Sequence, residues 1–204
     1  MADTVQANKG AVSSLADTDL VMCVASGGSY RPVSYADLAK AIRASIHIGG
    51  RNLLKGTAEG LALDGNGPVN KKYPFAESMD FGKWAGRSIT VSYDYAYENA
   101  STGSIYSQSR FVISTAFDLA SGKTYKEAVV NLPFNSSGIS GGGHKTHTFV
   151  VPEGASNTEV QQSCSIQLAS GKARMWNIKI EEGNMPTAWT PAPEDLASGA
   201  CGGG

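Results

Sequence analysis

Much of the chain between residues 52 and 182 alternates between apolar and polar residues. In the longest alternating segment, residues 88–98, one face carries two aliphatic residues and three tyrosines: Ile89, Val91, Tyr93, Tyr95 and Tyr97. The other face carries mostly hydroxyl and acidic side chains. A period of two is typical of a strand with one buried face, so we expect a long, half-buried strand here.

Four shorter segments, 110–118, 146–152, 163–169 and 176–181, show the same alternation. In the last of them Trp176 shares the apolar side with two isoleucines, which predicts that Trp176 is a structural anchor. Glycine-containing turn signals separate the segments, and the triple glycine at 141–143 is interpreted as one of them. Several short strands with such turns predict an antiparallel β-sandwich.

The first 48 residues have a different pattern. Two short strand candidates, at 19–26 and 31–35, precede a predicted helix at 34–46. Ser34 is the expected N-cap of this helix, and Asp37 completes a capping box. Gly49-Gly50 is interpreted as a hinge. We therefore expect a small α+β module at 1–48, a β-sandwich at 49–196 and a flexible glycine-rich tail at 197–204.

Composition agrees with a turn-rich β protein and excludes several functions. The 204 residues include 24 glycines, and only 17% of the residues are charged. A formal net charge of -1 argues against nucleic-acid binding, which usually needs a basic surface. The first residues lack the apolar core of a secretory signal, and no apolar run is long enough to cross a membrane.

The cysteines and histidines do not form a recognisable metal site. Cys23, Cys164 and Cys201 are scattered and are expected to be reduced thiols in a protein that folds in a cytoplasm. His144 and His147 are three residues apart, so they would face opposite sides of a strand, and a loop beside a strand is the expected interpretation. We expect no metal and no cofactor.

The segment 177–196 closes the strand region with a turn and three prolines around one tryptophan. Pro186, Pro191 and Pro193 disfavour helix and favour extended backbone. Such a segment forms few backbone hydrogen bonds of its own, so side chains must hold it. Trp189 is the expected structural anchor, which would plug the end of the sandwich core.

Two of these sequences resemble a known domain type. "KIEEGNMPTAWTPAPEDL" and "NLLKGT", at 52–57, resemble the closing motif and the first strand of carbohydrate-binding-module-like jelly-roll domains in bacteriophage virion proteins, especially tail and head fibres. The first module, "ADTDLVMCVASGGSYRPVSYADLAKAI", resembles short N-terminal modules of phage fibre proteins. The resemblance implies a jelly roll at 49–196, location in a virion assembled in the bacterial host cytoplasm, and a homotrimer.

Catalysis is not expected. The sequence has no G-x-S-x-G phrase, and the adjacent carboxylates Glu181 and Glu182 would point to opposite faces of a strand. We interpret this pair as a solvated strand end. The chain is therefore expected to be non-enzymatic.

Aromatic residues give the candidate glycan site. Trp84, Tyr97 and Tyr106 could form a sugar-binding surface at the rim of the sandwich, and they could equally fill the ends of its core. The sequence thus predicts a fibre-type virion protein that contacts other virion proteins and host-surface polysaccharide, without membrane insertion. Two alternatives stay open: a capsid decoration (cement) protein that binds no host, and a free carbohydrate-binding module.

Overall fold

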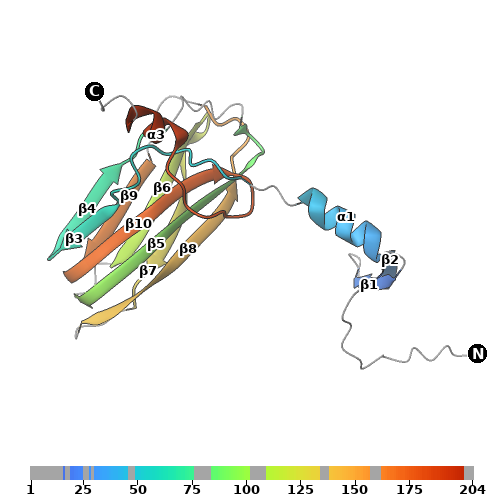
Figure 1. The fold of residues 1–204 in the computed structure, drawn as a ribbon, viewed down its shortest axis with the longest axis horizontal. Coiled ribbons are helices and arrows are strands. Elements are labelled where there is room, and N and C mark those ends of the chain that lie inside the picture. The colour runs from blue at the N-terminus through green and yellow to red at the C-terminus, as the bar shows by residue number, and fades with distance from the viewer. Residues whose placement is uncertain are drawn as a thin grey trace, which may run out of the picture. The chain divides into compact units, whose positions relative to one another are not determined.

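A computed structural model of the chain describes residues 16, 19–24, 28, 30–45, 49–75, 84–101, 109–133, 138–156 and 162–199. The chain divides into two compact units, Met1–Ile46 and His47–Gly204 (Figure 1). The boundary expected after residue 48 falls two residues later than the division that the structure shows. No helix in the described ranges has both the length and the apolar character needed to span a membrane.

The first unit is a hairpin followed by a helix. Strands β1 (Leu20–Val24) and β2 (Tyr30–Ser34) pair antiparallel, and α1 (Tyr35–Ser45) follows directly. The backbone N–H of Asp37 donates to Ser34 Oγ at 3.1 Å, and the Ser34 hydroxyl donates to the Asp37 carboxylate at 2.6 Å. This confirms the predicted cap and fixes where the helix begins.

One face of this hairpin is apolar and uncovered. The register pairs Met22 with Pro32, so Leu20, Met22, Tyr30 and Pro32 share a face. Leu20, Met22 and Tyr30 are 68%, 59% and 70% exposed. Five-residue strands and one helix bury little apolar surface by themselves, and such a unit is stabilised when another surface covers it.

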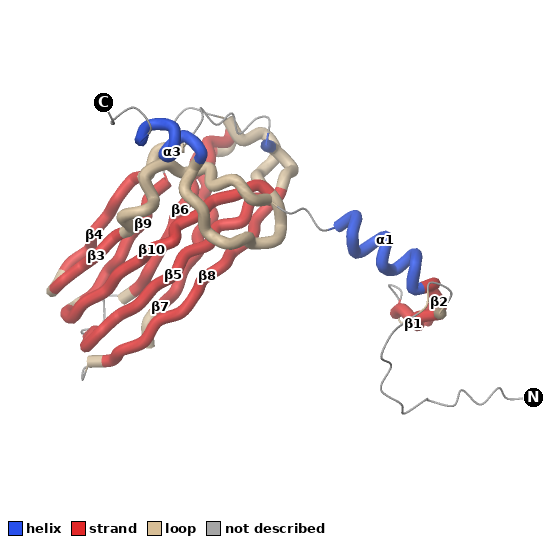
Figure 2. The backbone as a smooth tube through the Cα atoms, viewed as in Figure 1, coloured by secondary structure: helices blue, strands red, loops and turns tan. Residues whose placement is uncertain are grey.

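The second unit is a sandwich of two four-stranded antiparallel sheets. Its strands are β3 (Leu61–Asp64), β4 (Gly67–Lys72), β5 (Ser88–Ser101), β6 (Arg110–Leu119), β7 (Gly122–Asn131), β8 (Ile139–Val150), β9 (Gln162–Leu168) and β10 (Ser170–Glu182). One sheet has the order β3-β10-β5-β8, and the other has the order β4-β9-β6-β7 (Figures 1 and 2). This strand order is that of a jelly roll. The expected fold class, mainly β with a small α+β module before it, is therefore confirmed.

The core lies between the two sheets. Tyr93 of β5 is fully buried there, and its hydroxyl donates to the carbonyls of Phe111 and Ala128 in the opposite sheet, at 3.2 and 3.1 Å. Tyr95 and Tyr97 pack against Phe111, with ring centroids 5.0 and 6.3 Å away. The three tyrosines predicted to share a face thus all face the core.

Cysteine 164 is a core residue. Its side chain on β9 is fully buried, and burial raises the pKa of the Cys164 thiol to about 12. The thiol is consequently protonated and unreactive at neutral pH. Cys23 and Cys201 have no described side chains, so their expected state lies outside the described residues.

Two predictions of irregular backbone are wrong. The triple glycine at 141–143 lies inside β8, where a Cβ at Gly141 would lie 2.7 Å from the Tyr97 hydroxyl and one at Gly143 would lie 3.1 Å from the Tyr95 hydroxyl. The absence of a side chain is what lets the two rings lie over the strand.

The second error concerns the end of the chain. Residues 193–199 form a helix, α3 (Pro193–Gly199), instead of extended backbone and the start of a flexible tail. Pro193 begins this helix, and the first turn tolerates proline because its N–H would have no intrahelical partner.

Candidate functional site

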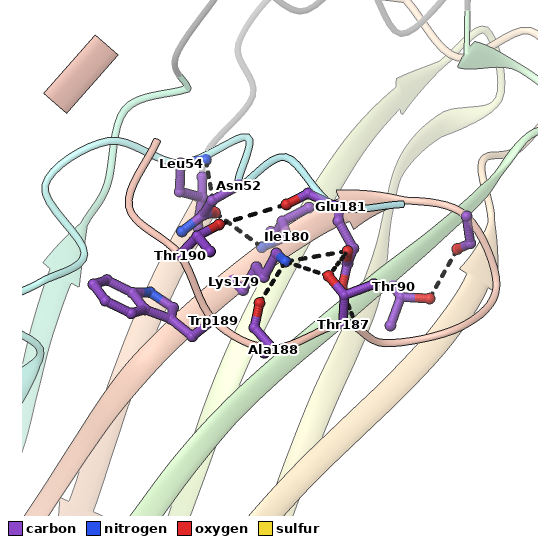
Figure 3. A network of polar contacts seen from close by, with 12 residues as sticks. Asn52, Leu54, Thr90, Lys179, Ile180, Glu181, Thr187, Ala188, Trp189 and Thr190 are labelled. Carbon is purple, nitrogen blue, oxygen red and sulfur yellow. Dashed lines mark hydrogen bonds and ion pairs between the residues drawn. The ribbon is translucent and has the colours of Figure 1, made fainter. Parts of the chain in front are cut away.

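The two motifs that resemble phage fibre domains meet in the fold (Figure 3). Asn52 is buried, and its amide donates to Thr57 Oγ1 and to the Ile178 carbonyl, both at 3.1 Å. The indole N–H of Trp189 reaches the same two acceptors, at 3.3 and 3.2 Å. Trp189 of the closing motif is therefore bound to Thr57 of the opening motif, and Asn52 shares both of its acceptors.

The last residues of the closing motif also contact residues in and next to the opening motif. The carboxylate of Asp195, in the first turn of α3, accepts from the backbone N–H of Gly56 at 2.9 and 3.1 Å. Glu194 forms an ion pair with Arg51. These contacts show that the "PED" of the closing motif holds the start of the domain in place.

Trp189 does not plug the sandwich core. It is half-buried and is not among the side chains that form or pack against the core in the described part of the chain. Trp189 holds the backbone around it through its indole N–H. The tryptophan is an anchor, but of the loop outside the sheet instead of the core.

That loop, residues 183–192, crosses the outer face of the β3-β10-β5-β8 sheet, and we call it the strap (Figure 2). Beneath it Lys179 and Glu181 of β10 are fully buried, with Nζ and Oε2 3.2 Å apart. Thr187 of the strap donates its hydroxyl to the Glu181 carboxylate at 2.6 Å, and the Ala188 carbonyl accepts from Lys179 at 2.9 Å (Figure 3). The expectation that Glu181 is solvated is wrong, because the strap covers it.

A one-residue bulge in β10 divides the sheet face. Trp176 pairs with Asp94 of β5 and Lys179 pairs with Ser92, so β10 has one extra residue between the two pairs. Asn177 takes a left-handed backbone conformation there, with a φ of 50°. Before the bulge Met175 points into the core, and after it Ile178 does.

The bulge moves Trp176 out of the core. The expectation placed Trp176 on the same side as Ile178 and Ile180, but the extra residue reverses the alternation between them. Trp176 is half-buried on the outer face and is not part of the core cluster of the described residues. The expected face of Trp176 is therefore corrected, and its role as a structural anchor stays a prediction.

The outer face on this side of the bulge is not covered by the strap. The register places side chains of all four strands on it, and we call this set the open face: Ala62, Asp64, Asp94, Ala96, Glu98, Gly142, His144, Lys172, Arg174 and Trp176. Ala62 and Ala96 at its centre leave a groove of about 470 Å³ over β3, β10 and β5. The open face is thus hollow, polar at its rim and aromatic at one end.

Asp94 organises the aromatic end. Its carboxylate accepts from the Asn177 amide at 2.7 Å and lies 2.7 Å from His144 Nδ1. These two contacts tie β5 to β10 and β8 next to Trp176. Polar groups beside the ring are therefore held in place before any ligand binds, which reduces the entropy lost on binding.

Arg174 lies over Trp176. Its guanidinium carbon is 4.2 Å from the centroid of the indole ring, in a cation–π contact along the same strand. At the opposite end of the groove Lys172 is 3.8 Å from Asp64, and Glu98 lies opposite Lys172 in the register. The groove consequently has a cationic end at Arg174, next to Trp176 on the open face, and a second end at which two carboxylates flank a lysine.

The sequence-predicted glycan residues do not come together. Trp84 packs against the core just before β5, whereas Tyr97 lies nine residues into β5, which is about 30 Å along the strand from its first residue at the usual rise per residue. Tyr97 borders the groove, but its ring packs on the core side. Tyr106 lies outside the described residues. The structure therefore offers the open face, and not these three residues, as the candidate site.

The histidines lie within β8, not in a loop. They face opposite sides, as the spacing predicts: His144 contacts Asp94 on the outer face, and His147 lies 6.0 Å from the Phe149 ring on the core side. Burial and the nearby Lys145 and Lys126 lower the pKa of His147. Within the described ranges, no three metal-ligating side chains form a group.

Sequence reasoning missed Arg174, Asp94 and the position of Trp176 on the outer face of the sheet. The alternation of Lys172, Arg174 and Trp176 places all three on one face, which is a usable signal. The same alternation would put Ile178 and Ile180 on that polar face too, although both are apolar. This change from polar to apolar residues at positions of the same parity is the sign of the bulge in the sequence. The asparagine between the two runs is the residue type that best tolerates the conformation, after glycine.

Comparisons with known proteins give likenesses of structure alone. No family model matches the sequence, and no curated protein matches it. Similar solved structures include a family 16 carbohydrate-binding module, with 12% identity and a TM-score of 0.42 over 63% of this chain and 85% of that one. The tripod from the baseplate of bacteriophage Tuc2009 has 17% identity and a TM-score of 0.46, over 74% and 61% of the two chains. Tailspike protein 4 of bacteriophage CBA120 has 12% identity and a TM-score of 0.37, over 60% and 15%.

Proposed function

We propose that the chain is a non-enzymatic, fibre-type protein of a bacteriophage virion whose jelly roll binds host-surface glycan through the open face. The virion assignment is supported by the resemblance of residues 52–57 and 179–196 to fibre domains. In the fold these two stretches hydrogen-bond to each other, which supports the view that the resemblance extends over the whole domain.

The observation that carries glycan binding is the position of Trp176. It lies outside the core, on the part of the outer sheet face that the strap does not cover, beside the fixed carboxylate of Asp94 and the amide of Asn177. A sugar ring offers an apolar face for an aromatic ring and hydroxyls for such polar groups. A few well-placed polar groups beside apolar surface are typical of a small-ligand site.

The exposed face of the hairpin supports attachment. Leu20, Met22 and Tyr30 are large apolar side chains left in solvent on a unit that cannot bury them itself. Contiguous exposed apolar surface marks sites of protein contact. In this proposal the first unit docks to other virion proteins or to further copies of the chain, which form a homotrimer.

Glycan binding is tested with two variants of the full chain, one at Trp176 and a control at Tyr125. Trp176→Ala should weaken binding to immobilised host-cell polysaccharide roughly tenfold or more, as loss of a central aromatic contact does in other interfaces. Tyr125→Ala removes a 57% exposed aromatic from β7 in the opposite sheet and should leave binding unchanged. Equal binding by Trp176→Ala and the unsubstituted chain would contradict the proposed site.

Attachment is tested separately. Met22→Lys in the full chain places a charge on the exposed hairpin face without touching the jelly roll. We expect it to reduce incorporation of the chain into particles, and sedimentation analysis should show whether it also dissociates a trimer. Normal incorporation of Met22→Lys would exclude this face as the attachment surface.

A further inference from the structure

We infer that the open face selects acidic glycans, with Arg174, held next to Trp176, binding the carboxylate of an acidic sugar. This inference rests on the proposed function and names the ligand class of the same site. The evidence for it is the position of the Arg174 guanidinium, its lack of a carboxylate partner and the groove beside it.

The first observation is the position of Arg174. Its guanidinium carbon lies over the indole of Trp176, 4.2 Å from the ring centroid, which holds the group next to the ring. The N–H donors of a guanidinium point outward from its edge. Contact with the ring also restricts a long side chain that would otherwise lose rotamer freedom on binding.

The second observation is that this cation has no carboxylate partner. Among the residues that the structure describes, Arg174 has neither an ion pair nor a hydrogen bond to an acid. The other cation of the groove, Lys172, is 3.8 Å from Asp64 and opposite Glu98. Asp94, the nearest acid in the register to Trp176, is engaged by His144 and Asn177.

The third observation is the space beside Arg174. The residues opposite it on the neighbouring strands are Ala62 and Ala96. Their methyl side chains cannot bind a guanidinium, and they are too small to fill the surface. The resulting groove of about 470 Å³ falls within the usual range of small-ligand sites, about 300–1,000 Å³. A ligand can therefore lie on the alanines and present a group to the guanidinium edge.

These observations point to a planar anion. A guanidinium edge matches a carboxylate with two parallel hydrogen bonds, and such charge-assisted pairs are stronger than neutral ones. Asp64 and Glu98 at the other end of the groove would repel a second negative charge and can accept hydrogen bonds from hydroxyls. The acid group therefore lies at the Arg174 end, and the neutral part of the glycan lies toward Lys172.

The test uses the full chain on a panel of immobilised acidic and neutral polysaccharides. Each acidic member is paired with its carboxyl-reduced form, which has the same sugars without the charge, and teichoic acid supplies phosphate in place of carboxylate. We expect binding to carboxylate-bearing members that falls roughly ten- to hundredfold on carboxyl reduction. Binding should also weaken as salt rises.

Two variants identify the residue. Arg174→Gln should abolish the preference for an acidic polysaccharide over its reduced form, and Arg174→Lys, which keeps the charge but not the two-pronged donor edge, should keep an intermediate preference. Arg87→Gln is the matched control, because it removes a 57% exposed arginine that pairs with Glu182 away from the groove. Unchanged melting temperatures would show that the variants are folded.

The outcomes separate the two proposals. Equal binding of acidic and reduced forms, or an unchanged preference in Arg174→Gln, overturns the acidic-glycan inference and leaves glycan binding standing. Preference for teichoic acid over every carboxylate overturns the carboxylate as the ligand group. Binding to no member of the panel overturns the glycan-binding function and the inference with it.

Discussion

The two halves of one sheet face show how the same strand can serve stability or recognition. On the strap side of the Asn177 bulge, the polar residues Lys179 and Glu181 are fully buried and paired. On the other side Arg174 and Trp176 remain on the surface beside a groove. Charged and aromatic residues on a strand therefore do not reveal their role until the loop that covers them, or leaves them open, is known.

The largest expected effect is on the covered half. Lys179→Met leaves the Glu181 carboxylate buried without its cation, and breaking a buried pair in this way typically costs about 3–5 kcal/mol of unfolding free energy. Lys172→Met, on the open half of the same strand, should change it by less than about 0.5 kcal/mol. Urea denaturation of both variants measures the contrast.

A double variant sharpens this result. Lys179→Met with Glu181→Leu removes both charges and should recover much of the lost stability, because two buried apolar side chains leave no charge without a partner. Equal costs for Lys179→Met and Lys172→Met would show that the two halves do not differ as described.

The next effect concerns the boundary between the halves. Asn177→Ala places a less tolerant residue at a φ of 50° and should cost about 1–2 kcal/mol. Asn177→Gly accepts that backbone and loses only the hydrogen bond to Asp94, so it should cost less. Thermal unfolding of the pair distinguishes the two contributions, and a costlier glycine variant would argue against backbone strain.

A smaller effect compares the two outer tryptophans. Trp189→Phe keeps a ring but loses the indole donor to Ile178 and Thr57, which should cost about 1 kcal/mol. Trp176→Phe keeps a ring on the open face and should leave stability within about 0.5 kcal/mol of the unsubstituted chain. Similar losses in both variants, measured by chemical denaturation, would contradict the different roles given to them.

The smallest expected effect is on the pH dependence of stability, and it comes from His147 on the core side of β8. Because the pKa of His147 is lowered in the folded chain, the unfolded chain binds a proton more readily below the ordinary histidine pKa of about 6.5. His147 therefore makes stability fall as the pH drops below that value. His147→Gln should flatten the curve of unfolding free energy between about pH 6.5 and 5. Parallel curves for the two proteins would show that His147 does not contribute.

The sequence predicts those parts of the fold that local rules determine. Residues 88–98 alternate without interruption, so the face of β5 that carries Tyr93 could be assigned to the core in advance. The cap of Ser34 on α1 follows from two residues three positions apart. The closing motif predicted an anchoring role for Trp189, although not the loop that Trp189 holds.

The errors arise where long-range contacts override local patterns. Three consecutive glycines favour a turn, but in β8 they make room for Tyr95 and Tyr97 from the neighbouring strand. Trp176 changes face because of one extra residue that pairing with β5 reveals. Glu181 is buried because Thr187, in a loop that follows, folds back over it.

The position of β10 has a consequence for the order in which the domain is completed during synthesis. It is the last strand of the jelly roll in the sequence, yet it lies between β3 and β5. A ribosome therefore releases both neighbours before the strand that joins them, and each keeps an unpaired edge until β10 inserts. The strap follows β10, so Lys179 and Glu181 stay hydrated until that final segment emerges. Such late, distant pairing slows folding and leaves unfinished chains open to aggregation, which makes the last quarter of the domain its point of vulnerability in the cell.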